Sequence, residues 1–192
     1  MAKTYRKMEL TKELLDAARS RAASLPVFEG SHRKRQANIV GCIGEVVFER
    51  LLEKNGIPFV DHRESTQRDY VVNERLSLEV TTKDRTVRPK INFDNSVPLY
   101  NHEHQRPDFY YFVSLYRVRG EDEQDIARFR EAYLLGGIDL ETLDRVGRHW
   151  NAGDTDPANG TKFWTACINV SMEQLLSNEQ MLRIFTGEGR VE

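Results

Sequence analysis

The fold is decided by the stretch from residue 69 to residue 83, which reads DYVVNERLSLEVTTK. Apolar and polar residues alternate along it, and this period of two is typical of β-strands with one buried face. Asn73-Glu74 interrupts the alternation, and Asn is a residue type that favours turns. We therefore expect strands at 69–72 and 76–83 joined as a hairpin, with a strand at 58–61 completing a three-stranded meander.

Helical periodicity precedes this meander. Apolar residues recur at three- and four-residue spacing between Ile39 and Leu52, which is the pattern of a helix with one buried face. Asn38 is a residue type that caps a helix start, and Gly56 is one that ends a helix. A further helix is expected at 11–25, where Thr11 supplies the cap.

The segments after the meander predict further strands and short helices. Residues 84–107 are charged and rich in turn formers, so we expect a loop there. Residues 109–116 are aromatic and β-branched, as in a strand buried on both faces. The remaining expected elements are strands at 132–138 and 162–169, helices at 124–130 and 139–146, and a last helix capped by Ser171.

These elements together predict a single α/β domain over residues 1–192, with a central mixed β-sheet flanked by helices. Its core would span 38–117. The helix at 11–25 would precede that core, and an α/β extension would follow it at 118–192.

Composition excludes several classes of protein. Of the 192 residues, 39% are hydrophobic and 30% are charged, which is too apolar for a disordered chain, and the formal charge of −2 shows no overall basic excess. The longest apolar run, 109–113, is too short to cross a bilayer, and the first residues do not resemble a signal peptide. Cys42 and Cys167 match neither a zinc spacing nor a disulfide framework. We expect a cytoplasmic protein with reduced thiols and no membrane partner.

Three carboxylates stand out for chemistry. Glu45 lies mid-helix beside two glycines, Asp69 opens a strand, and Glu79 lies on the hairpin partner of that strand. Asp69 and Glu79 come together because the turn lies midway between them. Two adjacent carboxylates repel each other, and a hard cation relieves this repulsion. Mg²⁺ suits such a pair, and Lys83, on the same strand face as Glu79, could assist a metal-bound water.

The helix and meander, with Glu45, Asp69 and Glu79 in this order, resemble the PD-(D/E)XK nuclease superfamily over residues 38–117. The resemblance implies a restriction-endonuclease-like core, of the kind found in small phage or homing endonucleases. It further implies that Asp69, Glu79 and the Val80 carbonyl bind Mg²⁺ or Mn²⁺, with Glu45 supporting the metal. Catalytic roles would fall to Glu45, Asp69, Glu79 and a lysine.

The sequence departs from the motif of that family at two positions. Arg68 stands where the family has proline, and Thr81 stands at the lysine position of E-x-K. Lys83 follows two residues later, about 6.6 Å further along the same strand face. We expect its side chain to lean back toward the carboxylates.

Basic residues and histidines flank these carboxylates in the sequence. Such clusters hold phosphate backbones, so we expect DNA contacts from Arg33, Lys34, Arg35, Arg85, Arg88, Lys90, His102 and His104. Each run is also compatible with an ordinary solvated loop. The two histidines lack a third ligand at regular spacing, which argues against a zinc site.

The expected function is a Mg²⁺-dependent DNA endonuclease that hydrolyses phosphodiester bonds with a metal-activated water. Because Thr81 replaces the lysine, a catalytically degenerate nucleic-acid-binding protein is the alternative. A structural or interaction module whose carboxylates are surface charge is the third. A homodimer is compatible with the sequence, although no heptad pattern argues for one.

Overall fold

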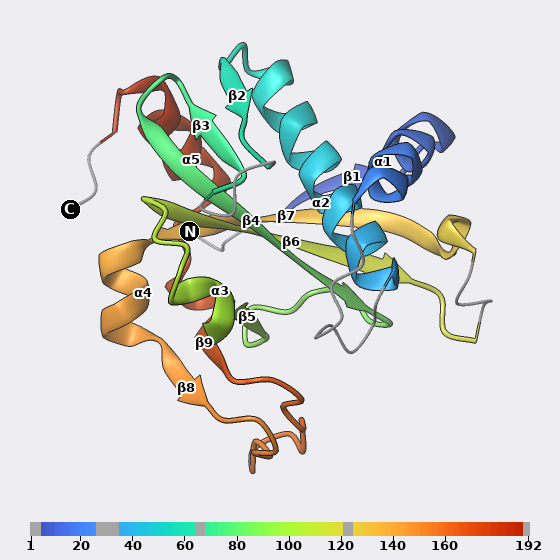
Figure 1. Ribbon diagram of the computed structural model, residues 1–192, viewed down its shortest axis with the longest axis vertical. Helices are drawn as coiled ribbons and strands as arrows, with labels where there is room; N and C mark the ends of the chain where they lie inside the picture. The colour runs from blue at the N-terminus through green and yellow to red at the C-terminus, as the bar shows by residue number, and fades with distance from the viewer. Residues whose placement is uncertain (1–4, 26–34, 64–67, 121–124, 190–192) are drawn as a thin grey trace.

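Two β-sheets organise the chain in the computed structural model, which describes residues 5–25, 35–63, 68–120 and 125–189 (Figure 1). The larger sheet has the strand order β1-β7-β6-β4-β3-β2. Its strands are β1 (Arg6–Glu9), β2 (Phe59–Asp61), β3 (Tyr70–Val72), β4 (Leu76–Arg85), β6 (Phe109–Arg117) and β7 (Phe129–Asp139). The smaller sheet has the order β5-β9-β8, with β5 (Asp94–Pro98), β8 (Arg148–Trp150) and β9 (Cys167–Ser171).

The larger sheet is mixed. Strands β2, β3 and β4 form an antiparallel meander, and β4 then pairs in parallel with β6. The connection between these parallel strands carries β5 and the short helix α3 (Leu99–His102). The other helices are α1 (Lys12–Ser24), α2 (Arg35–Lys54), α4 (Leu140–Val146) and α5 (Asn178–Thr186). The prediction of a single α/β domain with a mixed sheet flanked by helices is confirmed.

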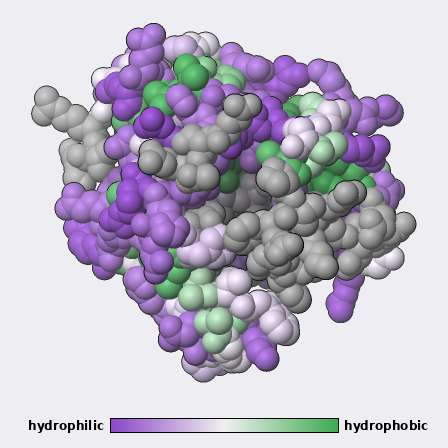
Figure 2. All heavy atoms as spheres, in the orientation of Figure 1, coloured by the Kyte–Doolittle hydropathy of each residue, from purple (hydrophilic) through white to green (hydrophobic). Residues whose placement is uncertain are grey.

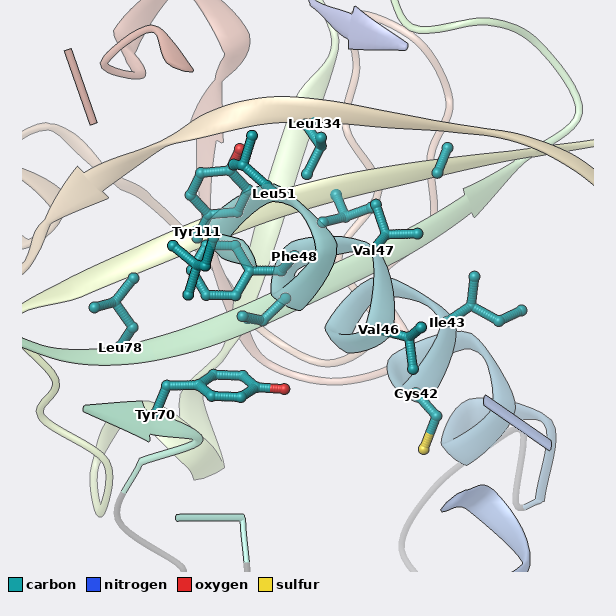
Figure 3. Packing of buried hydrophobic residues seen from close by; sticks show 14 of the residues in the cluster. Cys42, Ile43, Val46, Val47, Phe48, Leu51, Tyr70, Leu78, Tyr111 and Leu134 are labelled. Atoms are coloured by element: carbon teal, nitrogen blue, oxygen red, sulfur yellow. The ribbon is translucent and has the colours of Figure 1, made fainter. Parts of the chain in front are cut away.

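A hydrophobic cluster covers each face of the larger sheet. Helices α1, α2 and α5 pack on one face. In this cluster the ring centroid of Phe48 lies 4.7 Å from that of Tyr111 and 5.6 Å from that of Tyr70 (Figure 3). Strands β5 and β9 and helix α4 contribute to the cluster on the other face. Because side chains alternate along β4, Leu78 and Val80 point toward α2 and Glu79 points toward the opposite face.

Several expected elements differ from the structure. Strand β1 was not expected, and β5 lies inside the expected loop at 84–107. The strand expected at 162–169 lies instead at Cys167–Ser171. A 3-10 turn, Ile126–Arg128, replaces the helix expected at 124–130, and another, Met172–Gln174, follows Ser171, so that α5 begins only after the Ser177 cap.

The surface on the side viewed in Figure 1 is mostly hydrophilic. Apolar residues appear there as separate patches rather than as one continuous area (Figure 2). Among the helices of the described ranges, none combines the length and the apolar character needed to span a bilayer.

Candidate active site

The β3–β4 hairpin and helix α2 bring three carboxylates to one edge of the meander. The Tyr70–Leu78 register places Asp69 opposite Glu79, and the Asp69 N–H donates to the Leu78 carbonyl at 3.0 Å. The Val80 N–H donates to Asp69 Oδ2 at 2.8 Å, which fixes this carboxylate against β4. Glu45 reaches the same edge from α2, so that its charge acts on both Asp69 and Glu79.

Burial makes this carboxylate pair costly to ionise. Glu79 is only 9% exposed, and in the described part of the chain no group donates a hydrogen bond to its Oε2 atom. Burial raises the pKa of Glu79 well above its usual value, and the charges of Asp69 and Glu45 raise it further. The pKa of Asp69 is raised by burial and by Glu45, although the Val80 N–H and Arg63 oppose the shift. A cation bound between the two carboxylates would offset both the burial and the charge repulsion that raise these pKa values.

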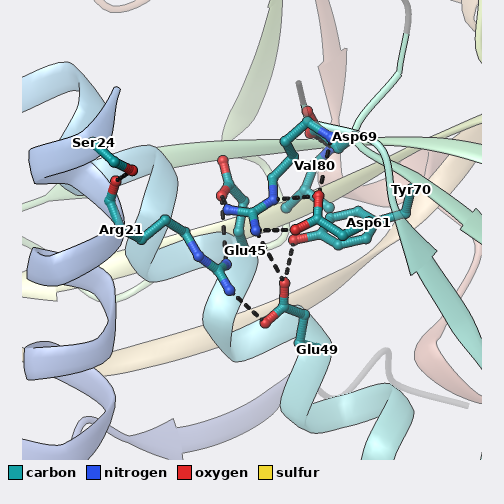
Figure 4. Close-up of polar contacts among 9 residues, drawn as sticks. Arg21, Ser24, Glu45, Glu49, Asp61, Asp69, Tyr70 and Val80 are labelled. Carbon is teal, nitrogen blue, oxygen red and sulfur yellow. Dashed lines mark hydrogen bonds and ion pairs between the residues drawn. The ribbon is translucent and has the colours of Figure 1, made fainter. Parts of the chain in front are cut away.

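Arg63 and Arg21 both approach Glu45. Arg63 Nη1 donates to Glu45 Oε2 at 2.8 Å, and Arg21 Nη1, which makes no hydrogen bond within the described ranges, lies 3.6 Å from the same oxygen. Figure 4 shows Arg21 reaching from α1 toward Glu45 and Glu49 of α2. The side chains of Glu45 and Arg63 are 13% and 17% exposed. Burial, the largest cause, raises the pKa of Glu45, and the charge and hydrogen bond of Arg63 act in the opposite direction.

The carboxylate oxygens of Asp69 and Glu79 suit a hard cation that needs few protein ligands. Within the described ranges, no group of three or more His, Cys, Asp or Glu side chains is placed to hold a metal ion. Mg²⁺ needs only one or two carboxylates, because it retains waters and binds substrate phosphate oxygens. Asp69 and Glu79 meet this requirement. The N–H and the C=O of one strand residue point toward the same neighbouring strand. Because the Val80 N–H donates to Asp69, the Val80 carbonyl points to this edge as well.

Lys83 lies on the strand face of Glu79 but its amine is directed toward the smaller sheet. Lys83 Nζ lies 3.5 Å from Ser96 Oγ on β5, and its charge also acts on the Cys167 thiol of β9. Thr81, between Glu79 and Lys83, is half-buried. The expectation that Lys83 leans back to the carboxylates stays a prediction.

The expected phosphate-binding residues have different surroundings. Arg85 is partly buried, donates to the Asp94 carbonyl at 2.6 Å and lies over the Phe93 ring. Arg88 is exposed and donates to Glu131 at 2.9 Å, while Lys90 is exposed. Arg33 and Lys34 lie outside the described residues. Arg35 begins α2, and its side chain is also outside the description.

The two histidines lie in opposite environments. His102 is 6% exposed, and its ring nitrogens lie 2.9 Å from the Tyr110 hydroxyl and 2.8 Å from Asp144 Oδ1. These contacts hold the ring against Tyr110 of β6 and Asp144 of α4, and the expectation that His102 contacts DNA stays a prediction. His104 is exposed.

Sequence reasoning missed the residues around Glu45. The side chains that complete this network are Arg21, Glu49, Asp61, Arg63 and Tyr70. One local signal exists, because Glu45 and Glu49 are four residues apart and are therefore neighbours on one face of α2. Nothing in the sequence assigns Arg21 of α1 and Arg63 after β2 to that face, since their approach depends on tertiary packing.

Comparison with known proteins returns no relative: no family model, no curated protein and no solved structure matches this chain. The carboxylate site itself is therefore the basis for assigning a function.

Proposed function

We propose that the protein is a metal-dependent DNA endonuclease that hydrolyses phosphodiester bonds. The observation that carries this proposal is the buried pair of Asp69 and Glu79, with Glu79 Oε2 lacking a donor among the described groups. A buried carboxylate without a cationic partner is expensive to keep ionised unless a ligand compensates its charge. A divalent cation is such a ligand.

The order of elements supports the same proposal. A helix with an interior glutamate, a meander with an aspartate and a glutamate, and a crossover to a parallel strand follow one another as α2, β2–β4 and β6. The resemblance to the PD-(D/E)XK superfamily implies a helix with a glutamate, a meander with an aspartate and a glutamate, and then an α/β continuation, which is compatible with this order.

In the proposed reaction, Asp69, Glu79 and the Val80 carbonyl would hold Mg²⁺ or Mn²⁺. When bound, the cation supplies positive charge that favours attack by water and stabilises the charge on the phosphate. The Val80 N–H orients Asp69, and the surrounding core limits access of bulk water to Glu79. Lys83 would leave Ser96 and place its ammonium along the strand, near the phosphate oxygens.

A catalytically inactive nucleic-acid-binding protein is the second candidate. Two observations favour it: Thr81 occupies the lysine position of the motif, and the Lys83 amine lies beside Ser96. In this case, DNA would bind without being cut.

Plasmid cleavage tests both candidates. Supercoiled DNA is incubated with Mg²⁺, with Mn²⁺ or with a chelator, using wild type, Asp69→Asn, Lys83→Ala and, as control, Glu53→Gln on the exposed side of α2. We expect cleavage to depend on metal and to fall about 10²-fold or more in Asp69→Asn and in Lys83→Ala. Asp69→Asn weakens the metal site, and Lys83→Ala removes a charge-stabilising or proton-transfer group. The control should cleave as wild type does.

Three outcomes separate the candidates. Cleavage by Asp69→Asn at the wild-type rate contradicts the metal site. Wild-type cleavage by Lys83→Ala removes that residue from the mechanism. Salt-dependent DNA binding without cleavage in any metal selects the inactive binding protein.

A further inference from the structure

We infer that Arg63 and Arg21 act as a clamp that holds the Glu45 carboxylate out of the coordination shell of the cation, so that Asp69 and Glu79 provide its carboxylate ligands. This inference rests on the proposed function and deepens it. It differs from the role that the family resemblance implies for Glu45. Both arginines are positioning residues, because they act through Glu45.

Each arginine also has partners other than Glu45. Arg63 donates two side-chain hydrogen bonds to Asp61, from Nε to Oδ1 at 2.8 Å and from Nη2 to Oδ2. Arg21 Nη2 donates to Glu49 at 2.8 Å, and Glu49 in turn accepts from the Tyr70 hydroxyl at 2.8 Å (Figure 4). Both guanidinium groups are therefore fixed by neighbours before they contact Glu45, and this preorganisation favours the bonded position of its carboxylate.

Both arginines approach the same atom, Glu45 Oε2, at 2.8 and 3.6 Å. The side chains of Arg21, Glu45, Glu49 and Arg63 are 13–21% exposed, so the ion pairs among them are weakly screened by water. Moving Glu45 to a cation would leave Arg63 beside a divalent charge with one partner fewer. Separating a partly buried ion pair in this way is strongly unfavourable.

Asp69 and Glu79 have no comparable clamp. The Val80 N–H donates to the Asp69 carboxylate, the Asp69 and Glu79 side chains share a hydrogen bond, and within the described chain no group donates to Glu79 Oε2. The three carboxylates at this edge thus divide into one that is already neutralised and two that a cation can use.

Terbium luminescence distinguishes a ligand from a clamped neighbour. The difference between Tb³⁺ lifetimes in H₂O and D₂O counts the waters bound to the ion, which replaces the cation as a hard, oxygen-binding probe. We compare wild type with Glu45→Gln and Arg63→Gln. The matched control is Arg50→Gln, because Arg50 lies on α2 as Glu45 does and, like Arg63, pairs with acidic side chains, here Glu13 at 2.8 Å and Glu53 at 3.1 Å.

We expect Glu45→Gln and Arg50→Gln to bind Tb³⁺ with the wild-type number of waters. Arg63→Gln should lose about one water, because the released Glu45 can enter the coordination shell. A gain of about one water in Glu45→Gln would make Glu45 a ligand and overturn the inference, while leaving the proposed nuclease intact. An unchanged water count in Arg63→Gln would also overturn it, provided that its thermal unfolding matches that of wild type.

If Arg63→Gln does not fold, Glu45→Gln still tests the inference by itself, because a gain of about one water in that variant overturns it. Failure of the wild-type protein to bind Tb³⁺ would overturn the metal site of the proposed function, and the clamp with it. The two failures are therefore distinguishable.

Discussion

At the scale of single residues, Glu79 carries an energetic cost that only a ligand or a proton removes. Its folded-state pKa is raised, mainly by burial and then by Asp69 and Glu45. A carboxyl group of this kind stabilises the fold when protonated, and that stability is lost as pH rises from the unfolded-state pKa through the raised folded-state pKa. The metal-free protein should therefore become less stable over this range, because Asp69 behaves in the same way.

Glu79→Gln should weaken this pH dependence. The amide is neutral at every pH, so the variant should melt at a higher temperature than wild type in chelator near about pH 8, and the difference should shrink toward about pH 4. Thermal scans across pH measure it. Glu53→Gln, an exposed carboxylate of α2, is the control and should not change the slope. A Glu79→Gln variant that is less stable than wild type at high pH would show that the ionised carboxylate has a stabilising partner.

At the scale of elements, the position of helix α2 depends on the close approach of Gly44 to Thr82 on β4. A Cβ atom added at Gly44 would lie 1.8 Å from Thr82 Oγ1, whereas one added at Gly41 would meet nothing nearer than Glu45 Oε1 at 3.8 Å. Both glycines lie inside the same helix, where alanine is intrinsically better by about 1 kcal/mol. They form a matched pair that separates helix propensity from packing.

Gly44→Ala should lower the free energy of unfolding by about 1–3 kcal/mol, because overpacking moves α2 and Glu45 away from the hairpin. Gly41→Ala should be neutral or stabilising. Urea denaturation of both variants measures the difference. Equal stabilities would mean that α2 can shift without cost, and the position of Glu45 would then not be fixed by this contact.

Elements that form by local pattern were predictable, and those that depend on distant partners were not. Helix α2 and the β3–β4 hairpin follow from short-range periodicity, capping and a turn. Strand β1 exists because Arg6 pairs with Leu134, and β5 exists because Asp94 pairs with Ser171. The same distinction holds in the site: Asp69 and Glu79 share a hairpin, whereas the Arg63–Glu45 contact requires β2 and α2 to pack together.

At the scale of the whole molecule, a formal charge of −2 gives no overall attraction to a polyanion, so any DNA contact would depend on local basic groups. The loop after β4 offers two exposed cations, Arg88 and Lys90, while Arg85 is directed inward to the Asp94 carbonyl. If this loop contacts DNA, each phosphate contact releases counterions, and the logarithm of affinity falls linearly with the logarithm of salt concentration.

Arg88→Gln and Lys90→Gln should each reduce that salt slope by about 1 and weaken binding equally for all DNA sequences, because phosphate contacts carry no base information. Arg85→Gln should instead leave the slope unchanged and lower the melting temperature, since it removes a partly buried hydrogen bond. Fluorescence anisotropy at several salt concentrations measures the slopes, with Arg145→Gln at the end of α4 as an exposed control. Unchanged slopes in Arg88→Gln and Lys90→Gln would place the DNA on another face of the molecule.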